Sequence, residues 1–168
     1  MAKQLLLVRH GKSEKEDHDL KDFDRPLNHK GNKNSIAMAE KLLTNHFSIP
    51  FLLSSPACRA ISTAKHFARV FDIREDKIQT NTAIYEANTT ALLQVVNNLP
   101  NEYDTIAMFG HNPGFTDFAN YLDDAHIYNI PTSGIVIINF DVDDWKEISR
   151  HTGTMLSFDF PNNTEEPH

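Results

Sequence analysis

The uninterrupted apolar run near the N-terminus constrains the fold more than any other feature of this sequence. The run Leu5-Leu6-Leu7-Val8 ends in Arg9-His10-Gly11. A strand that is apolar on both of its faces is typical of a parallel sheet that helices cover on both sides. We therefore predict a central strand at residues 5–8, with an arginine, a histidine and a glycine turn at its carboxyl end.

The rest of the chain alternates short apolar runs with amphipathic stretches, which is the pattern of an α/β fold. The spacing predicts helices at residues 30–46, 57–71, 89–99 and 115–122, and further strands at 51–54, 105–109, 134–142 and 154–160. The charged segment 12–28 is predicted to form a surface loop. We expect one domain over residues 1–161, a three-layer sandwich with a mostly parallel central sheet and helices on both faces, followed by a flexible C-terminal tail at 162–168.

Composition narrows the classes of partner and cofactor. The net charge of -7 argues against nucleic acids and anionic membranes as partners, because both require a basic protein surface. None of the nine histidines forms an i, i+4 pair with a glutamate between, so we expect no metal ion and no other cofactor. The apolar run before Arg9 is too short for a signal peptide or a membrane span, which makes a cytoplasmic location the expectation and leaves the oligomeric state open.

Three predicted strands end in residue types that can bind an anion. These segments are Arg9-His10-Gly11, Ser54-Ser55-Pro56-Ala57-Cys58-Arg59 and Gly110-His111-Asn112-Pro113-Gly114. In an open α/β sheet, ligands bind beyond the carboxyl ends of the strands, so the three segments can converge on one site. Two histidines and two arginines would then form a cationic pocket that suits a tetrahedral dianion such as a phosphoryl group.

These segments resemble the histidine phosphatase superfamily, the phosphoglycerate mutase-like group that carries an Arg-His-Gly turn. Together with Arg25-Pro26-Leu27 and Gly31, they are most similar to the small SixA-type phosphohistidine phosphatases, over about residues 4–140. The resemblance implies a phosphoglycerate mutase-like fold. It also implies a hydrolase that forms a covalent phosphohistidine intermediate without a metal ion.

The resemblance also assigns roles to particular residues. His10 would be the nucleophile, and Arg9 and Arg59 would bind the phosphoryl oxygens as charge develops on them. His111 would be protonated and would donate a hydrogen bond to one of these oxygens. The substrate-binding residues would be Arg9, Gly11, Arg59, His111 and Asn112.

The general acid is less clearly assigned. Glu86 lies about where the superfamily places a carboxylic acid that protonates a poor leaving group. A phosphohistidine substrate has an imidazole leaving group that departs readily once protonated, so SixA-type enzymes need not depend on such an acid. Glu86 is therefore either a general acid or a surface residue before the helix at 89–99. Further candidates for the site are Lys12, Ser13, Thr132 and Ser133.

The connections between the predicted elements bear on the substrate. The links after the second strand and before His111 are short, whereas larger relatives use insertions there to build a lid over a small metabolite. An open site suits a phosphorylated side chain presented by another protein. The leading hypothesis is a phosphatase of phosphohistidine on a partner protein. The alternatives are a phosphatase of small phosphate esters and, from another class, a non-catalytic phosphate-binding module.

Overall fold

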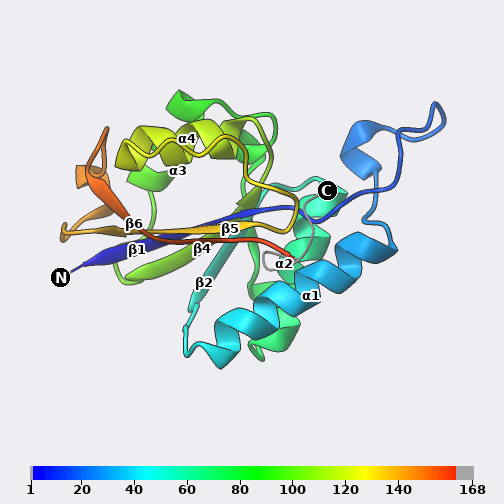
Figure 1. Cartoon of the computed structure of the whole chain (residues 1–168), viewed down its shortest axis with the longest axis horizontal. Helices are drawn as coiled ribbons and strands as arrows, with labels where there is room; N and C mark the ends of the chain where they lie inside the picture. Colours follow the sequence, from blue (N-terminus) through cyan, green and yellow to red (C-terminus); the bar gives the residue numbers. More distant parts are fainter. Residues whose placement is uncertain (1, 162–168) are drawn as a thin grey trace.

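Six strands form the central sheet of the computed structural model, which describes residues 2–161 (Figure 1). They are β1 (Lys3–Arg9), β2 (Phe51–Ser54), β3 (Gln79–Thr80), β4 (Thr105–Gly110), β5 (Ile135–Phe140) and β6 (Gly153–Asp159). Their order is β3-β2-β4-β1-β5-β6, in which the first four are parallel, β5 is antiparallel to β1, and β6 is antiparallel to β5. The predicted mostly parallel sheet is confirmed. The predicted tail at 162–168 lies outside the described residues.

Helices cover both faces of this sheet (Figure 1). Helices α1 (His29–Thr44) and α2 (Cys58–Val70) lie on one face, and α3 (Thr89–Asn97) and α4 (Gly114–Asp123) lie on the other. Short 3-10 turns occur at η1 (Asp22–Asp24), η2 (Glu75–Lys77), η3 (Thr82–Ile84) and η4 (Trp145–Glu147). The predicted three-layer α/β architecture is therefore confirmed. No helix among the described residues is both long and apolar enough to cross a membrane.

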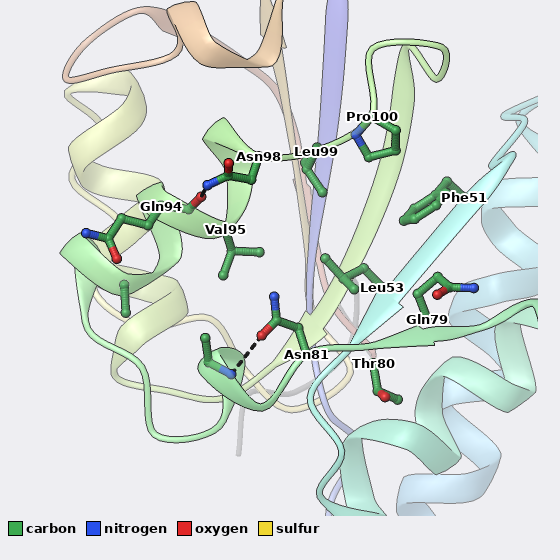
Figure 2. Close-up of a pocket in the computed structure, with 12 residues that line it drawn as sticks. Phe51, Leu53, Gln79, Thr80, Asn81, Gln94, Val95, Asn98, Leu99 and Pro100 are labelled. Atoms are coloured by element: carbon green, nitrogen blue, oxygen red, sulfur yellow. Dashed lines mark hydrogen bonds between the residues drawn. The ribbon is translucent and has the colours of Figure 1, made fainter.

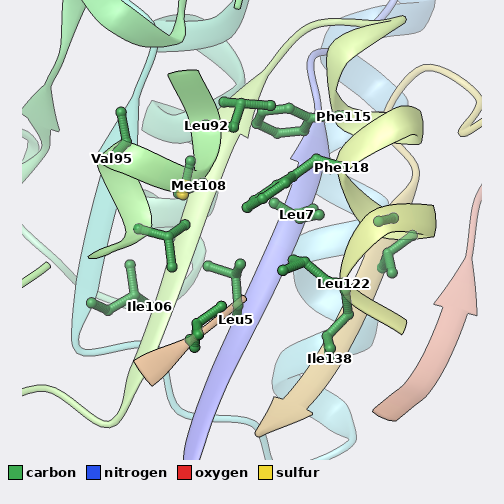
Figure 3. Packing of buried hydrophobic residues seen from close by; sticks show 14 of the residues in the cluster. Leu5, Leu7, Leu92, Val95, Ile106, Met108, Phe115, Phe118, Leu122 and Ile138 are labelled. Carbon is green, nitrogen blue, oxygen red and sulfur yellow. The ribbon is translucent and has the colours of Figure 1, made fainter. Parts of the chain in front are cut away.

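Strand β1 contributes side chains to two separate cores. Leu5 and Leu7 pack with α3 and α4 in one core, which Figure 3 shows, while Leu6 and Val8 pack with α1 and α2 in the other. All four side chains are fully buried, because successive residues of a strand point to opposite faces and both faces are covered. Each such side chain contributes about 1.5–3 kcal/mol on burial. The apolar run thus places β1 at the centre of the domain.

Three details differ from the sequence prediction. Strand β4 lies between β1 and β2, so the first two strands along the chain are not neighbours. Strand β3 was not predicted, because its two residues are polar and exposed and give no apolar signal. In the predicted helix at 30–46, helical spacing puts Leu43 on one apolar stripe with Ala39 and Leu42, but its exposed fraction is 46%. The buried face of α1 is offset from that stripe and includes Ser35 and Met38.

Candidate active site

The carboxyl ends of β1, β2 and β4 bring His10, Arg59 and His111 together. Strand β4 pairs with both β1 and β2, so His10 after β1, His111 after β4 and the α2 residue Arg59 lie at the same sheet edge. The two imidazole rings have a centroid separation of 5.1 Å. The Nε of Arg59 lies 3.3 Å from Nε2 of His10. All three side chains are nearly buried.

The ring of His10 is held in one tautomer. Its Nδ1 lies 2.7 Å from the carbonyl oxygen of Gly11, and a carbonyl can only accept, so Nδ1 carries the proton. The other nitrogen, Nε2, keeps its lone pair and accepts from Arg59. Burial lowers the pKa of His10 to about 3, and the positive charges of Arg59 and Arg9 act in the same direction. At neutral pH, His10 is therefore an uncharged imidazole with Nε2 directed into the site.

Gly11 is used for packing and for positioning His10. Its backbone N–H donates to Oγ1 of Thr63 at 2.9 Å, so this amide is already engaged within the protein. A Cβ at Gly11 would lie 2.8 Å from the carbonyl oxygen of Gly31 in α1, a distance too short for any side chain. The glycine therefore lets the turn after β1 lie directly against α1.

Ser133 ties this turn to the segment before β5. Its backbone N–H is shared between the carbonyl oxygens of Arg9 and His10, both at 3.1 Å. Its φ of 62° lies in the left-handed region, which is uncommon for a serine and is sustained only by surrounding contacts. The side chain is buried, and its Oγ lies 3.2 Å from Oγ of Ser35 in α1. Ser133 thus fixes backbone geometry at the site.

Most donors of Arg9 have no partner among residues 2–161. Its Nη1 donates to the carbonyl oxygen of Ile130 at 2.8 Å, and its Nε is buried without a partner among the described residues. Burial, together with the charge of Arg59, lowers the pKa of Arg9 from its usual range, and the group still stays charged at neutral pH. Arg9 therefore remains available to an anion.

Asp22 is a site residue that the sequence analysis missed. Arg59 donates from Nη1 to the Asp22 carbonyl oxygen at 2.8 Å and from Nη2 to its Oδ2 at 3.0 Å. The hydroxyl of Tyr85 donates to the same Oδ2 at 2.7 Å, and Arg25 donates to Oδ1. Hydrogen bonds from Arg25, Tyr85 and Arg59 hold the pKa of Asp22 well below its usual range. Asp22 is thus an ionised group that orients Arg59.

The sequence offered only a weak signal for this role. Asp22 was predicted to belong to a solvated acidic loop, and its neighbours Asp19 and Asp24 are indeed exposed. The i, i+3 spacing of Asp22 and Arg25 indicated a local ion pair, which the structure contains. The contact with Arg59 joins residues that are far apart along the chain and depends on where the loop folds back.

Without a bound anion the ring of His111 is neutral, and the protonated ring that we predicted concerns the site with a phosphoryl group bound. Its Nε2 lies 2.8 Å from Oγ of Ser55, and its Nδ1 is buried without a partner among the described residues. Burial, followed by the charge of Arg59, lowers the pKa of His111 to about 4, because a second positive charge is costly there. The ring of Tyr85 packs edge-on against it at 5.4 Å. Ser55 and Tyr85 therefore fix the orientation of His111.

Asn112 makes hydrogen bonds within the protein. Its Nδ2 donates to Oδ1 of Asn129 and to the carbonyl oxygen of Ile130, both at 2.9 Å. Its Oδ1 accepts from both the backbone N–H and the hydroxyl of Thr116. Because these bonds use both donors and both lone pairs of the amide, Asn112 holds the segment before β5 against α4.

The remaining candidates occupy the edges of the site. Glu86 is exposed with φ of 55°, and its carboxylate forms no hydrogen bond or ion pair with residues 2–161. The hydroxyl of Ser13 accepts from Arg25 and so supports the arginine that holds Asp22. Lys12 and Thr132 line a neighbouring cavity.

Two further features of residues 2–161 bear on ligand binding. Within residues 2–161, no group of three or more His, Cys, Asp or Glu side chains is arranged to hold a metal ion. A cavity of about 430 Å³ lies between α3 and the strands β2 and β3 (Figure 2). Its lining includes apolar Phe51 and Val95 and uncharged Asn81 and Asn98, and it contains none of the predicted site residues.

Comparison with known proteins identifies the family. The sequence profile of the histidine phosphatase superfamily (branch 1) matches residues 5–108. The chain belongs to this superfamily. An uncharacterized chloroplastic protein of Arabidopsis thaliana is 28% identical over 158 residues, which cover 88% of this chain and 71% of that protein.

Solved structures of the superfamily share the fold. The protein histidine phosphatase SixA complexed with tungstate has a TM-score of 0.81 and 21% identity, covering 96% of this chain and 99% of that one. A protein of Agrobacterium tumefaciens assigned as the phosphohistidine phosphatase SixA has a TM-score of 0.79 and 22% identity, covering 95% and 98% of the two chains. The phosphoglycerate mutase-like architecture expected from the resemblance is therefore confirmed for this superfamily member.

Proposed function

We propose that this protein is a phosphatase that transfers the phosphoryl group of phosphohistidine on a partner protein first to His10 and then to water. The observation that carries the proposal is the state of His10. Its Nδ1–H is held by the Gly11 carbonyl, its pKa is lowered to about 3, and its Nε2 lone pair is directed into the site. A neutral imidazole in this orientation is the form that attacks phosphorus.

The surrounding groups suit the charges that such a reaction creates. Attack by Nε2 of His10 forms a phosphorus–nitrogen bond while the bond to the leaving imidazole breaks, and that imidazole departs neutral after taking up a proton. Arg9 and Arg59 would bind the phosphoryl oxygens in the transition state. The dianion would raise the pKa of His111 and allow it to donate a hydrogen bond. Water then cleaves the bond to His10 and releases inorganic phosphate.

The carboxylates near the site favour phosphohistidine over an alkyl phosphate. An alkyl phosphate needs a carboxylic acid that protonates its leaving oxygen. Asp22, which contacts Arg59, is ionised because two guanidinium groups and a hydroxyl hold its pKa low. Glu86 is exposed and unpaired among the described residues. Since an imidazole leaving group does not require such an acid, phosphohistidine fits this arrangement.

The short connections at the sheet edge support a protein substrate. Residues 55–57 alone join β2 to α2, and residues 111–113 alone join β4 to α4. Neither link is long enough to fold over a small metabolite as a lid. A phosphorylated histidine on the surface of another protein can therefore reach this edge between the two links, beside the loop that carries Asp22 to Arg59.

The test compares wild-type protein with His10→Ala on a phosphohistidine-bearing protein and on phenyl phosphate. We expect the variant to lose turnover by at least about 10³-fold, since removing a nucleophile leaves only binding and charge stabilisation. Rapid quenching of the wild type should trap an acid-labile phosphoenzyme that the variant lacks. Full activity of His10→Ala would refute the nucleophile assignment.

Two further measurements separate the alternatives. Hydrolysis of phenyl phosphate without hydrolysis of phosphohistidine would favour a phosphatase of small esters. Binding of phosphohistidine protein without turnover by the wild type would favour a phosphate-binding module.

A chelator tests the metal-free mechanism. We expect it to leave the rate unchanged, and loss of activity that added metal ions restore would contradict that mechanism.

A further inference from the structure

A second cavity adjoins the candidate active site. It has a volume of about 340 Å³ and lies where the end of β1, the following turn, the start of α1 and the segment before β5 meet. Its lining includes three cationic side chains, two amides and one hydroxyl, from Arg9, Lys12, Lys30, Asn34, Asn129 and Thr132. No carboxylate from residues 2–161 lines it. The cavity is therefore positively charged within a protein whose net charge is -7.

The three cations have no carboxylate partner among the described residues. Neither Lys12 nor Lys30 forms an ion pair there, whereas Lys41 on the same helix as Lys30 pairs with a carboxylate of β6. Within the part of the chain that the structure describes, Arg9 donates only to the carbonyl oxygen of Ile130, and its buried Nε has no acceptor. Cations without carboxylate partners around a cavity raise the local concentration of anions. A buried N–H donor without an acceptor lowers the stability of the folded protein unless a ligand accepts from it. Both observations point to an anionic ligand.

Arg9 connects this cavity to the candidate active site. It lines the cavity, whereas His10, Arg59 and His111 do not. Arg9 directly precedes His10, and its Nη1 donates to the Ile130 carbonyl oxygen that also accepts from Asn112, the residue after His111, so the arginine borders the candidate active site. A substrate whose phosphoryl group lies at His10 can therefore extend past Arg9 into the cavity.

We propose that this cavity binds a second anionic group, a carboxylate or a phosphate, carried by the same substrate as the phosphoryl group. The inference rests on the proposed function, because it takes the phosphoryl group to lie at His10. The second group can come from an acidic side chain beside the phosphorylated residue of a protein or from an anionic substituent of a small phosphate ester. In either case Lys30 and Lys12 would recognise it, and Arg9 would lie between the two anions.

The test compares phenyl phosphate with its 2-, 3- and 4-carboxyphenyl analogues. For each protein, the ratio of KM for the best carboxylated ester to KM for phenyl phosphate reports recognition of the carboxylate. We expect Lys30→Gln to raise this ratio by about 1.5-fold to 5-fold, the range that one exposed ion pair supplies, and Lys30→Glu to raise it further. An acidic residue in the first turn of α1 is favourable to the helix, so Lys30→Glu should fold.

Lys33→Gln is the matched control. Lys33 is exposed on α1 and does not line the cavity, so its substitution removes the same charge from the same helix. We expect the ratio in Lys33→Gln to equal that of the wild type. An unchanged ratio in both Lys30 variants, or an equal change in Lys33→Gln, would overturn the proposal.

A binding measurement separates this proposal from the proposed function. Calorimetry with His10→Ala gives Kd for the same esters without turnover. A weaker preference for the carboxylated esters in the double variant His10→Ala with Lys30→Gln would support anion binding in the cavity. This holds even if the wild type hydrolyses none of the esters. Phosphohistidine peptides with glutamate or glutamine beside the histidine form the second arm. A preference for glutamate that Lys30→Gln reduces identifies a protein source, whereas a preference confined to the aryl esters identifies a small molecule. Absence of both preferences overturns the proposal.

Discussion

Acid sensitivity provides the most direct test of the state of His10, because it does not depend on any substrate. Burial lowers the pKa of His10 to about 3 in the folded protein, whereas an unfolded histidine has a pKa of about 6.5. As the pH falls below about 6.5, the unfolded chain takes up a proton that the folded state refuses. The folded state therefore loses stability over the window from about pH 6.5 to about pH 3, and the loss is complete below it.

The size of this loss follows from the two pKa values. Between pH 7 and pH 5, His10 alone should lower the free energy of unfolding by about 2 kcal/mol. His111, with its pKa lowered to about 4 by burial and by Arg59, should contribute a similar amount over the same interval. The variant His10→Gln removes the first contribution, so its free energy of unfolding should fall by about 2 kcal/mol less than that of the wild type.

Urea denaturation at pH 7 and pH 5 measures the difference. Trp145 is the only tryptophan and is fully buried, so its fluorescence reports unfolding. The control is His29→Gln, which removes an exposed imidazole from the start of α1 and should follow the wild type. Equal losses of stability in the wild type and in His10→Gln between the two pH values would refute the conclusion that burial keeps His10 neutral.

Three further substitutions test other parts of the site. Asp22→Asn removes the charge that orients Arg59. It should lower kcat by about 5-fold in steady-state assays on phosphohistidine protein, which corresponds to about half the free energy of a charge-assisted hydrogen bond. An unchanged kcat would contradict this role. Gly31→Ala places a Cβ 2.0 Å from the Lys12 carbonyl oxygen and should destabilise the protein by about 2–4 kcal/mol, seen as a lower Tm. Glu86→Gln should leave phosphohistidine turnover within about twofold of the wild type, and a tenfold loss would restore Glu86 as the acid.

The fold was largely predictable because its elements carry strong local patterns. The run in β1, which is apolar on both faces of the strand, predicted a central strand. The alternation of strands and amphipathic helices predicted the layers that the structure contains. The order of strands was not predictable, since the position of β4 between β1 and β2 depends on pairing between distant segments. Strand β3 was not predicted because neither of its two residues is apolar.

The candidate site was predictable to the extent that its residues lie at strand ends. His10 and His111 follow β1 and β4 directly, and Arg59 begins the helix after β2, so the topology brings them together. Asp22 could not be found in this way, because a loop carries it across the sheet edge to Arg59. The sequence did not show that His111 is neutral when no anion is bound, because burial, which sequence patterns do not measure, lowers its pKa.

The place of β1 in the sheet divides the site into two parts of unequal local stability. This strand pairs with β4 on one side and β5 on the other, so its amides can exchange with solvent only when the whole domain unfolds. The loop that carries Asp22 has isolated bridges between its own two limbs, such as that between Ser13 and Leu27, and it contacts Arg59 and Tyr85 through Asp22, so it can open without breaking the sheet. The backbone at His10 is therefore fixed by the sheet, whereas the position of Arg59 depends on a loop that the sheet does not hold.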